Sequence, residues 1–416
     1  MKVISYIFFG IGIVLVANRL SAQPMDSLDI KIGQMILIGV PGTSADPTVL
    51  KEIREGKAGS IIFFEKNIAA KNSYEQLKRM AWTYQSAAPI PLFVSIDQEG
   101  GRVNRLKEKY GFPKSLSASA MGQSLDSVRY YGLSTAATLA GLGINVNFAP
   151  VVDLASNPDN PVIAKVERSF SSNADTVALY AGEFIKTHRQ TGVITSLKHF
   201  PGHGSSEDDT HLGMADVTRT WSEEELIPYR KIIDGGYVNA IMTAHIVNKR
   251  LDRKGLPGTL SSSIIDSLLR NQLHFNGVVF SDDMQMHAIT KHYGLEEAIK
   301  LAVNAGVDIL TFSNNIQGSE ERTVDKVHSI IKKFVKDGTI PKERIDESFR
   351  RIMLLKRRLN QEDVDFYREE LLRREMELNR LRTQMSGMTI LPEKEEQTTQ
   401  ETEQPRKEKK KKKKKN

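Results

Sequence analysis

Eight short apolar runs alternate with longer helix-forming segments between about residues 30 and 358. The runs are apolar on both faces, which is typical of strands buried on both sides in a parallel sheet. Eight β-α units in a stretch of this length predict a (β/α)8 barrel, and a doubly wound open sheet is the alternative. The expected strands are Met35–Val40, Ser60–Phe64, Leu92–Asp97, Ile144–Pro150, Ile194–Phe200, Ala240–His245, Gly277–Asp282 and Asp308–Phe312. The expected helices include Ser73–Ser86, Val128–Leu142, Asp175–Thr191, Ser222–Asp234, Ser261–Asn271 and Leu295–Ala305.

The N-terminal residues resemble a secretory signal peptide. Lys2 is followed by a mostly apolar run from Val3 to Ala17, and small residues follow at Ser21 and Ala22. The run is short for a membrane span, so residues 1–22 are predicted to be a signal peptide. An uncleaved anchor is the alternative. The mature barrel domain is then expected over residues 23–359, exported to the periplasm or outside the cell.

The C-terminal residues differ in composition from the barrel. Residues 360–390 are predicted to form a helical extension, packed on the barrel or, as the alternative, in a coiled coil. Residues 391–416 are a low-complexity tail rich in Lys, which cannot form a core. The helical prediction rests on an apolar heptad pattern at Val364, Tyr367, Leu371, Leu378, Leu381 and Met385.

The net charge of +7 comes from this tail. The chain has 58 Lys+Arg and 51 Asp+Glu, and residues 405–416 alone hold nine cations and one Glu. The remaining 49 cations and 50 acids give −1, which argues against a nucleic-acid enzyme with a basic face. The tail is predicted to be solvated, and contact with an anionic surface is the alternative. With no Cys, disulfides and thiolate metal sites are excluded.

Polar residues follow several of the predicted strands. Chemistry in a (β/α)8 barrel takes place at the carboxyl ends of the strands, so these residues are expected to share one mouth. Asp97 begins the segment DQEGGRVNR, where a carboxylate could hold sugar hydroxyls and two glycines allow close approach of a ligand. The residues that end strands here are Asp97, Asp153, Lys198, His199, His245, Asp282 and Asp283.

Two segments contain candidate catalytic groups. In KHFPGHGSSEDDTH, Asp209 lies two residues before His211 and could orient its imidazole as a general acid/base pair. The alternative is a loop acid that caps a turn. Asp282 ends an apolar strand and is a candidate nucleophile or electrostatic stabiliser, whereas Asp283 is expected to point the other way and cap a helix.

These groups allow two mechanisms. A zinc-dependent barrel hydrolase would use His199, His203, His211, His245 and Asp282 as ligands. It lacks the early His-x-His strand ending expected of such enzymes, since the first strand ends in Gly39-Val40. A glycosidase would use Asp282 to attack an anomeric carbon, and the Asp209–His211 pair to move the proton. The glycosidase is the favoured interpretation, with no metal and no cofactor.

The sequence resembles glycoside hydrolase family 3, in its β-N-acetylglucosaminidase branch. The matching motifs are DQEGGRV at 97–103, ERSF at 167–170, KHFPGHG with D-x-H at 198–211, and SDDMQM at 281–286. The resemblance covers about residues 30–358 and implies a (β/α)8 barrel that hydrolyses β-linked sugars with retention. It implies Asp282 as nucleophile, His211 as acid/base and Asp209 as its orienting group. It also implies that the terminal N-acetylglucosamine is bound by Asp97, Arg105, Arg168, Lys198 and His199.

The resemblance also limits the substrate. Two-domain glucosidases of the family take their acid from a second domain, for which no room remains after residue 360. The expected activity is an exo-β-N-acetylglucosaminidase acting on peptidoglycan fragments, with chito-oligosaccharides as the next choice. A phosphorylase, another β-glycosidase of the same family and an inactive muropeptide-binding protein remain alternatives. One departure from the family is Ser205–Asp208, where relatives usually have Asp-Thr. The oligomeric state is left open.

Overall fold

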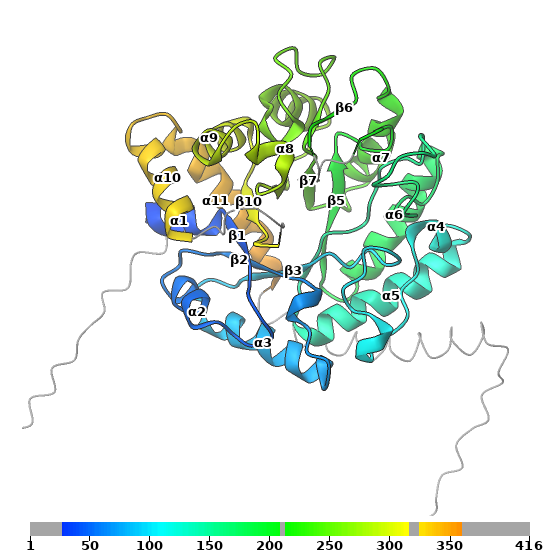
Figure 1. Cartoon of the computed structure of the whole chain (residues 1–416), viewed down its shortest axis with the longest axis horizontal. Helices are drawn as coiled ribbons and strands as arrows, with labels where there is room; N and C mark the ends of the chain where they lie inside the picture. The colour runs from blue at the N-terminus through cyan, green and yellow to red at the C-terminus, as the bar shows by residue number, and fades with distance from the viewer. Residues whose placement is uncertain (1–26, 209–212, 316–323, 360–416) are drawn as a thin grey trace, which may run out of the picture.

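The computed structural model describes residues 27–208, 213–315 and 324–359. Its centre is a closed barrel of eight parallel strands surrounded by helices (Figure 1), which confirms the predicted (β/α)8 fold. The order around the barrel is β1-β10-β9-β7-β5-β4-β3-β2. The strands are β1 Ile36–Gly39, β2 Ser60–Phe63, β3 Phe93–Ile96, β4 Val146–Asn147, β5 Ile194–Phe200, β7 Ala240–Thr243, β9 Val278–Asp283 and β10 Ile309–Phe312.

Each predicted helical segment contains a helix, and some of the helix ends have recognisable caps. The Asp46 carboxylate accepts from Thr48 N and Val49 N, 2.9 and 3.0 Å away, with Pro47 at the first helical position. Gly143 ends α5 with φ 77°, a conformation that suits glycine. The main α-helices are α1 Leu28–Gln34, α2 Pro47–Arg54, α3 Ser73–Ala87, α5 Leu125–Leu142, α6 Ala174–Arg189, α7 Ile227–Asp234, α9 Leu295–Ala305, α10 Val324–Lys336 and α11 Lys342–Lys356. The shorter helical segments are η1 Glu65–Asn67, η2 Glu108–Tyr110, α4 Ala118–Met121, η3 Glu223–Leu226, η4 Gly258–Leu260, η5 Ser263–Gln272, α8 His287–Thr290 and η6 Arg357–Leu359.

Aromatic side chains fill the barrel interior. The Phe280 ring packs edge to face against Phe148 and Phe93, with centroid distances of 5.1 and 6.2 Å. All three side chains are fully buried. The barrel is therefore a packed core, and only its open end is available for chemistry.

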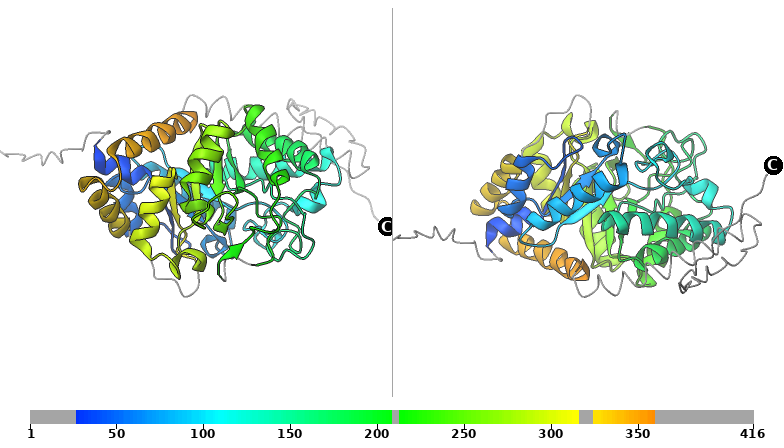
Figure 2. Two further views of the ribbon diagram at one scale, coloured as in Figure 1. Left: turned by 90° about the horizontal axis from the view of Figure 1, so that it is seen from above. Right: turned by 90° about the horizontal axis from the view of Figure 1, so that it is seen from below.

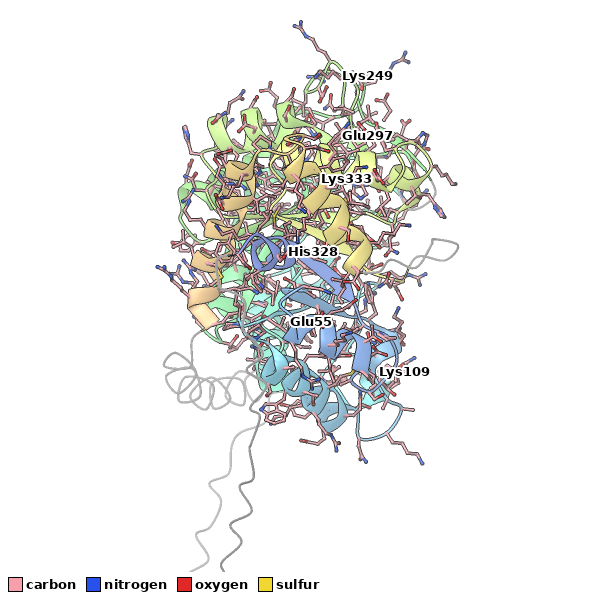
Figure 3. The ribbon with its side chains drawn as sticks, turned by 90° about the vertical axis from the view of Figure 1, so that its left-hand side faces the viewer. Glu55, Lys109, Lys249, Glu297, His328 and Lys333 are labelled. Carbon is pink, nitrogen blue, oxygen red and sulfur yellow. The ribbon has the colours of Figure 1, made fainter. Side chains whose placement is uncertain are left out.

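The helices that begin and end the barrel domain lie side by side (Figures 1 and 2). His328 on α10 donates its Nε2–H to the carbonyl of Asp29 on α1, 3.0 Å away, and Lys332 forms an ion pair with the Asp29 carboxylate at 2.6 Å. Figure 3 shows His328 on this flank, with Lys333 on the same helix. These contacts close the ring of helices across the seam between β1 and β10.

Three local features differ from the prediction. Strand β4 is shorter than Ile144–Pro150, because Pro150 has no N–H and pairing continues only through irregular bonds such as Val152 N to Lys198 O, 2.8 Å. A small parallel sheet of β6 (Ala215–Asp216) and β8 (Ile246–Val247) was not predicted. Segment η5 is a π-helix.

Several sequence predictions fall on residues outside the described ranges. They are the signal peptide (1–22), the helical extension (360–390), the Lys-rich tail (391–416) and the pair Asp209 and His211. Within the described ranges, no helix has the length and apolar character needed to cross a membrane.

Candidate active site

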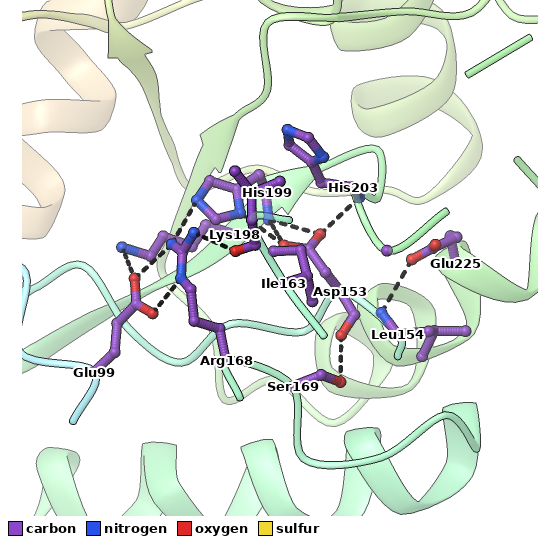
Figure 4. A network of polar contacts seen from close by, with 12 residues as sticks. Glu99, Asp153, Leu154, Ile163, Arg168, Ser169, Lys198, His199, His203 and Glu225 are labelled. Atoms are coloured by element: carbon purple, nitrogen blue, oxygen red, sulfur yellow. Dashed lines mark hydrogen bonds and ion pairs between the residues drawn. The ribbon is translucent and has the colours of Figure 1, made fainter. Parts of the chain in front are cut away.

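The predicted binding residues that follow β3 and lie on β5 form one connected network at the carboxyl ends of the strands. Figure 4 shows the part of this network made by Glu99, Arg168, Lys198 and His199. Lys198 Nζ lies 2.7 Å from Asp97 Oδ1 and 2.6 Å from Glu99 Oε1. Arg105 approaches Asp97 Oδ2 at 3.8 Å. Asp97 and Arg105 are 17% and 26% exposed, whereas Lys198 and Glu99 are 3% and 5% exposed. Asp97 and Arg105 therefore remain accessible to solvent, and the buried Lys198 pairs with Asp97.

Arg168 is held in a fixed orientation by Glu99. Its Nε and Nη2 each donate to one Glu99 carboxylate oxygen at 2.7 Å, and its Nη1 donates to the carbonyl of Val162 at 3.0 Å. Burial alone would raise the pKa of Glu99, but the charges of Arg168 and Lys198 outweigh it and hold that pKa well below its usual range. The guanidinium is thus positioned before any ligand binds.

The hydrogen bonds of His199 assign its protons. Arg168 Nη2 can only donate, so His199 Nε2, 3.2 Å away, accepts. His199 Nδ1 then carries the hydrogen and donates to Asp153 Oδ2 at 2.7 Å. Asp153 also accepts from the backbone N–H groups of His199 and His203. Burial alone would raise the pKa of Asp153, but His199 and its hydrogen bonds, with a smaller contribution from His203, lower it.

The two carboxylates at the end of β9 are used differently. Asp282 is half-buried, and its Oδ1 accepts from Asp283 N at 2.7 Å. Asp283 is buried and accepts from Ser313 Oγ, Ser313 N and Gln285 N, so it ties β10 to the turn after β9. Burial raises the pKa of Asp283 to about 6. The prediction that Asp283 caps a helix is wrong in detail, since α8 begins after Met286 and Asp283 caps the turn instead.

The side chains of the zinc alternative do not converge on one point where the structure describes them. His245 Nε2 donates to the carbonyl of Asp283 at 2.9 Å, so its Nδ1 accepts from Thr259 Oγ1 at 2.8 Å. Both nitrogens of His199 are also in use. Within the part of the chain that the structure describes, no three His, Asp or Glu side chains are grouped as metal ligands. Those residues therefore do not fit a zinc site, and we derive no metal-dependent step.

The sequence assigned no role to three buried acids of this region. Glu99 lies two residues after Asp97 and therefore on the same side of an extended chain. This spacing was a sequence signal that could have identified it. Asp153 follows the apolar stretch after β4, but its partner His199 is 46 residues away in the sequence. Glu225 lies in η3, within a run of three Glu that resembles a solvated surface, and nothing in the sequence distinguishes it.

Comparisons with known proteins agree with this architecture. A sequence model described as the glycosyl hydrolase family 3 N terminal domain matches residues 27–355. A beta-hexosaminidase of Tolumonas auensis is 35% identical over 289 residues, covering 68% of this chain and 84% of its own length.

Two solved structures are similar to the barrel. One is a glycoside hydrolase family 3 beta-N-acetylglucosaminidase from Paenibacillus sp. str. FPU-7, with a TM-score of 0.73 and 35% identity, covering 80% of this chain and 62% of that one. The other is a beta-N-acetylhexosaminidase from Beutenbergia cavernae, with a TM-score of 0.72 and 27% identity, covering 79% and 98%. The fold and these relatives define a glycoside hydrolase. The chain belongs to glycosyl hydrolase family 3.

Proposed function

We propose that this chain is a retaining exo-β-N-acetylglucosaminidase. The main support is the charged network at the barrel mouth, where Asp97 and Arg105 remain accessible above buried Lys198 and Glu99. Carboxylate and guanidinium groups held in place by ion pairs suit the hydroxyls of a terminal sugar. The names of the relatives in Tolumonas and Paenibacillus support the N-acetylglucosamine specificity.

The mechanism assigns one bond change to each catalytic group. Asp282 attacks the anomeric carbon, and the bond to the leaving oxygen breaks while His211 donates a proton to that oxygen. Water then attacks the glycosyl-enzyme bond, His211 takes a proton from the water, and Asp282 is released as a carboxylate. Asp209 orients the imidazole of His211, so the acid is supplied within the barrel chain itself.

The substrate we favour is a peptidoglycan fragment with a terminal N-acetylglucosamine, and chito-oligosaccharides are the second choice. We also propose export of the protein, because residues 1–22 have the pattern of a signal peptide. Together, the substrate and the export would place the enzyme on the outer side of the cytoplasmic membrane, where the peptidoglycan wall lies.

Removing Asp282 tests the covalent mechanism. Asp282→Ala is expected to lower kcat at least about 1,000-fold on every β-N-acetylglucosaminide, because every leaving group needs the nucleophile. Release of N-acetylglucosamine and of nitrophenol would be measured, with Asp337→Ala, an exposed acid on a surface turn, as the control. A folded Asp282→Ala enzyme with normal turnover would contradict the assignment.

Two further measurements on the wild type test the alternatives. Loss of activity in chelator, with recovery in zinc, would favour the metal mechanism. Formation of a sugar phosphate as the product would make the enzyme a phosphorylase.

Removing His211 tests the proton donor. An alkoxide leaving group needs a proton as the bond breaks, whereas nitrophenolate leaves largely without one. His211→Ala is therefore expected to slow cleavage of a disaccharide about 100-fold more than glycosylation by a nitrophenyl sugar. Asp209→Asn should show the same pattern more weakly. Pre-steady-state bursts would report glycosylation. Equal slowing of both substrates would make His211 a binding residue.

A further inference from the structure

Glu225 has a buried carboxyl group next to the turn that follows β5, and the proposed mechanism does not use it. It lies in η3 (Glu223–Leu226) and is 1% exposed. Its Oε2 accepts from Leu154 N at 3.2 Å, its Oε1 lies 3.5 Å from Ser156 Oγ, and the backbone N–H of Ser205 also donates to it. One side chain thus joins the segment after β4 to the segment after β5 (Figure 4).

The turn over Glu225 contains glycines at the points of closest approach. A Cβ at Gly202 would lie 2.5 Å from Glu225 Cβ, and one at Gly204 would lie 2.7 Å from Glu225 Oε1 and 1.9 Å from Leu154 O. Gly202 also has a φ of 118°, which other residues rarely adopt. The PGHG turn is therefore shaped around the Glu225 side chain, and its backbone is packed against the carboxylate with no room for another side chain.

Other polar side chains fix the same turn from neighbouring elements. Asp153 accepts from His203 N at 2.8 Å, and Asn160 Nδ2 donates to the carbonyls of His203 and Gly204 at 2.8 and 2.9 Å. Trp221 Nε1 donates to the carbonyl of Pro201 at 3.1 Å. With Glu225 bound to Ser205 N, the backbone of residues 201–205 is held at successive positions, a few residues before Asp209 and His211 in the sequence.

An acid in this position is costly to bury. Burial and the neighbouring negative charge of Asp153 raise the pKa of Glu225 to about 8. Other titratable groups of this region are His199 and His203, which interact with Asp153. Tyr229 is also buried here: burial raises the pKa of its hydroxyl, and the charges of Asp153 and Glu225 raise it further. The hydrogen bonds from Leu154 N and Ser205 N offset part of this cost, and a buried acid beside an active site is a candidate for a functional role.

We propose that Glu225 is a positioning residue of this active site. It fixes the base of the turn Pro201–Ser206 against the segment after β4, and so determines the placement of the chain that leads to Asp209 and His211. The proposal rests on the proposed function, because its catalytic consequence is the rate of the proton transfers assigned to His211. Asp97 and Lys198 make no direct contact with Glu225, and the link between them runs through Asp153, His199 and Arg168, so substrate binding is expected to change less than proton transfer.

The test compares Glu225→Ala, Glu225→Gln and the control Glu224→Ala, whose side chain is exposed one residue earlier in η3. Glu225→Ala is expected to lower kcat for a disaccharide about 100-fold, since a misplacement of about 1 Å in a catalytic group costs that much. KM should change less than about twofold, and glycosylation by a nitrophenyl sugar should slow less than about tenfold. Glu225→Gln retains one acceptor oxygen and the side-chain volume, so it should recover part of the rate. Glu224→Ala should match the wild type.

Hydrogen exchange supplies a readout that does not depend on any substrate. The amides of Leu154 and Ser205 should lose protection in Glu225→Ala, keep part of it in Glu225→Gln and keep all of it in Glu224→Ala. Unchanged protection in both Glu225 variants would overturn the proposal. A raised KM with equal slowing of disaccharide and nitrophenyl sugar would also overturn it, since that pattern indicates general loosening of the fold. If Glu225→Ala does not fold, Glu225→Gln decides by the same two measurements. A wild-type enzyme inactive on all N-acetylglucosaminides would contradict the proposed function, and hydrogen exchange would still decide whether Glu225 anchors the turn.

Discussion

The two ends of the barrel both contain buried ionisable groups, and they use them differently. At the mouth, Glu99 and Lys198 are buried, but the network continues to Asp97 and Arg105, which remain partly exposed. At the floor, where the strands begin, Asp308 is completely enclosed. Ion pairs at the mouth therefore end at partly exposed groups around the open end of the barrel, whereas those at the floor run from Asp308 through Arg344 and Arg351 to exposed Glu347 on α11.

The contacts of Asp308 show how the floor is saturated. Its Oδ1 accepts from Arg344 Nη2 at 2.6 Å and Ser348 Oγ at 2.8 Å, while its Oδ2 accepts from Arg270 Nη2 at 2.8 Å and Val279 N at 3.0 Å. Every contact is with the protein itself. Burial alone would raise the pKa of Asp308, but the three nearby arginines lower it. Such a group stabilises the join between strands and helices and has no capacity left for a ligand.

The difference separates stability from function within one fold. In a (β/α)8 barrel the floor maintains the structure and the mouth performs the chemistry. Groups that are both buried and fully satisfied are expected to affect folding alone. Groups whose network reaches the open end of the barrel are expected to affect both, because they are positioned by burial and used by a ligand. The predictions below test this separation.

The largest expected effect is at the mouth. Glu99→Gln removes the negative charge between Arg168 and Lys198 and leaves two buried cations without their shared partner. We expect the free energy of unfolding to fall by about 3 kcal/mol and kcat/KM to fall at least about 100-fold. Chemical denaturation and the release of nitrophenol would measure the two quantities. Loss of stability with normal kcat/KM would show that the mouth network is structural, like the floor.

A smaller total effect is expected at the floor. Asp308→Asn leaves Arg270, Arg344 and Arg351 without their carboxylate, so the free energy of unfolding should fall by about 3–5 kcal/mol. The folded enzyme should keep kcat/KM within about twofold, since no contact of Asp308 reaches the mouth. Thermal unfolding and kinetics on the same sample would test both statements. A large drop in kcat/KM at a temperature where the variant is folded would break the comparison.

The sequence was sufficient for the fold because each strand is a compact apolar run. All eight predicted runs overlap a barrel strand, since period-two and period-3.6 patterns are local properties. What it missed depends on distant partners. The pair β6 and β8 joins Ala215 to Ile246, and two-residue strands have too few side chains to form a pattern.

The candidate site was predicted in part for the same reason. Strand ends indicated Asp97, Lys198, His199 and Asp282, because position along a strand can be read locally. Asp153 and Glu225 could not be assigned, because their roles depend on contacts with residues far away in the sequence. The roles of the predicted site residues stay predictions, and Asp209 and His211 lie outside the described residues.

The smallest expected effect concerns Lys356, a buried amine at the floor. Its Nζ donates to Gln34 Oε1 and to the carbonyl of Gly59, both at 2.7 Å, and lies 4.8 Å from the centroid of the Phe93 ring. Burial lowers the pKa of Lys356 well below its usual 10.5. The two acceptors match the two hydrogens of a neutral amine, so we expect the folded protein to hold Lys356 uncharged.

This charge state gives the floor a pH dependence of defined sign. Between the lowered folded pKa and 10.5 the unfolded chain binds one more proton than the folded chain, so stability rises as pH rises. Relative to Lys356→Met, the wild type should gain about 1 kcal/mol of unfolding free energy between pH 8 and pH 9. Denaturation of both proteins at the two pH values would measure the difference, and all other titrating groups cancel in it. No change between the two pH values would mean that the floor holds a charged lysine against two carbonyl-type oxygens and an aromatic ring. The floor would then contain an ion without a counter-ion. The complete pairing of buried charges could then no longer serve to distinguish the floor from the mouth.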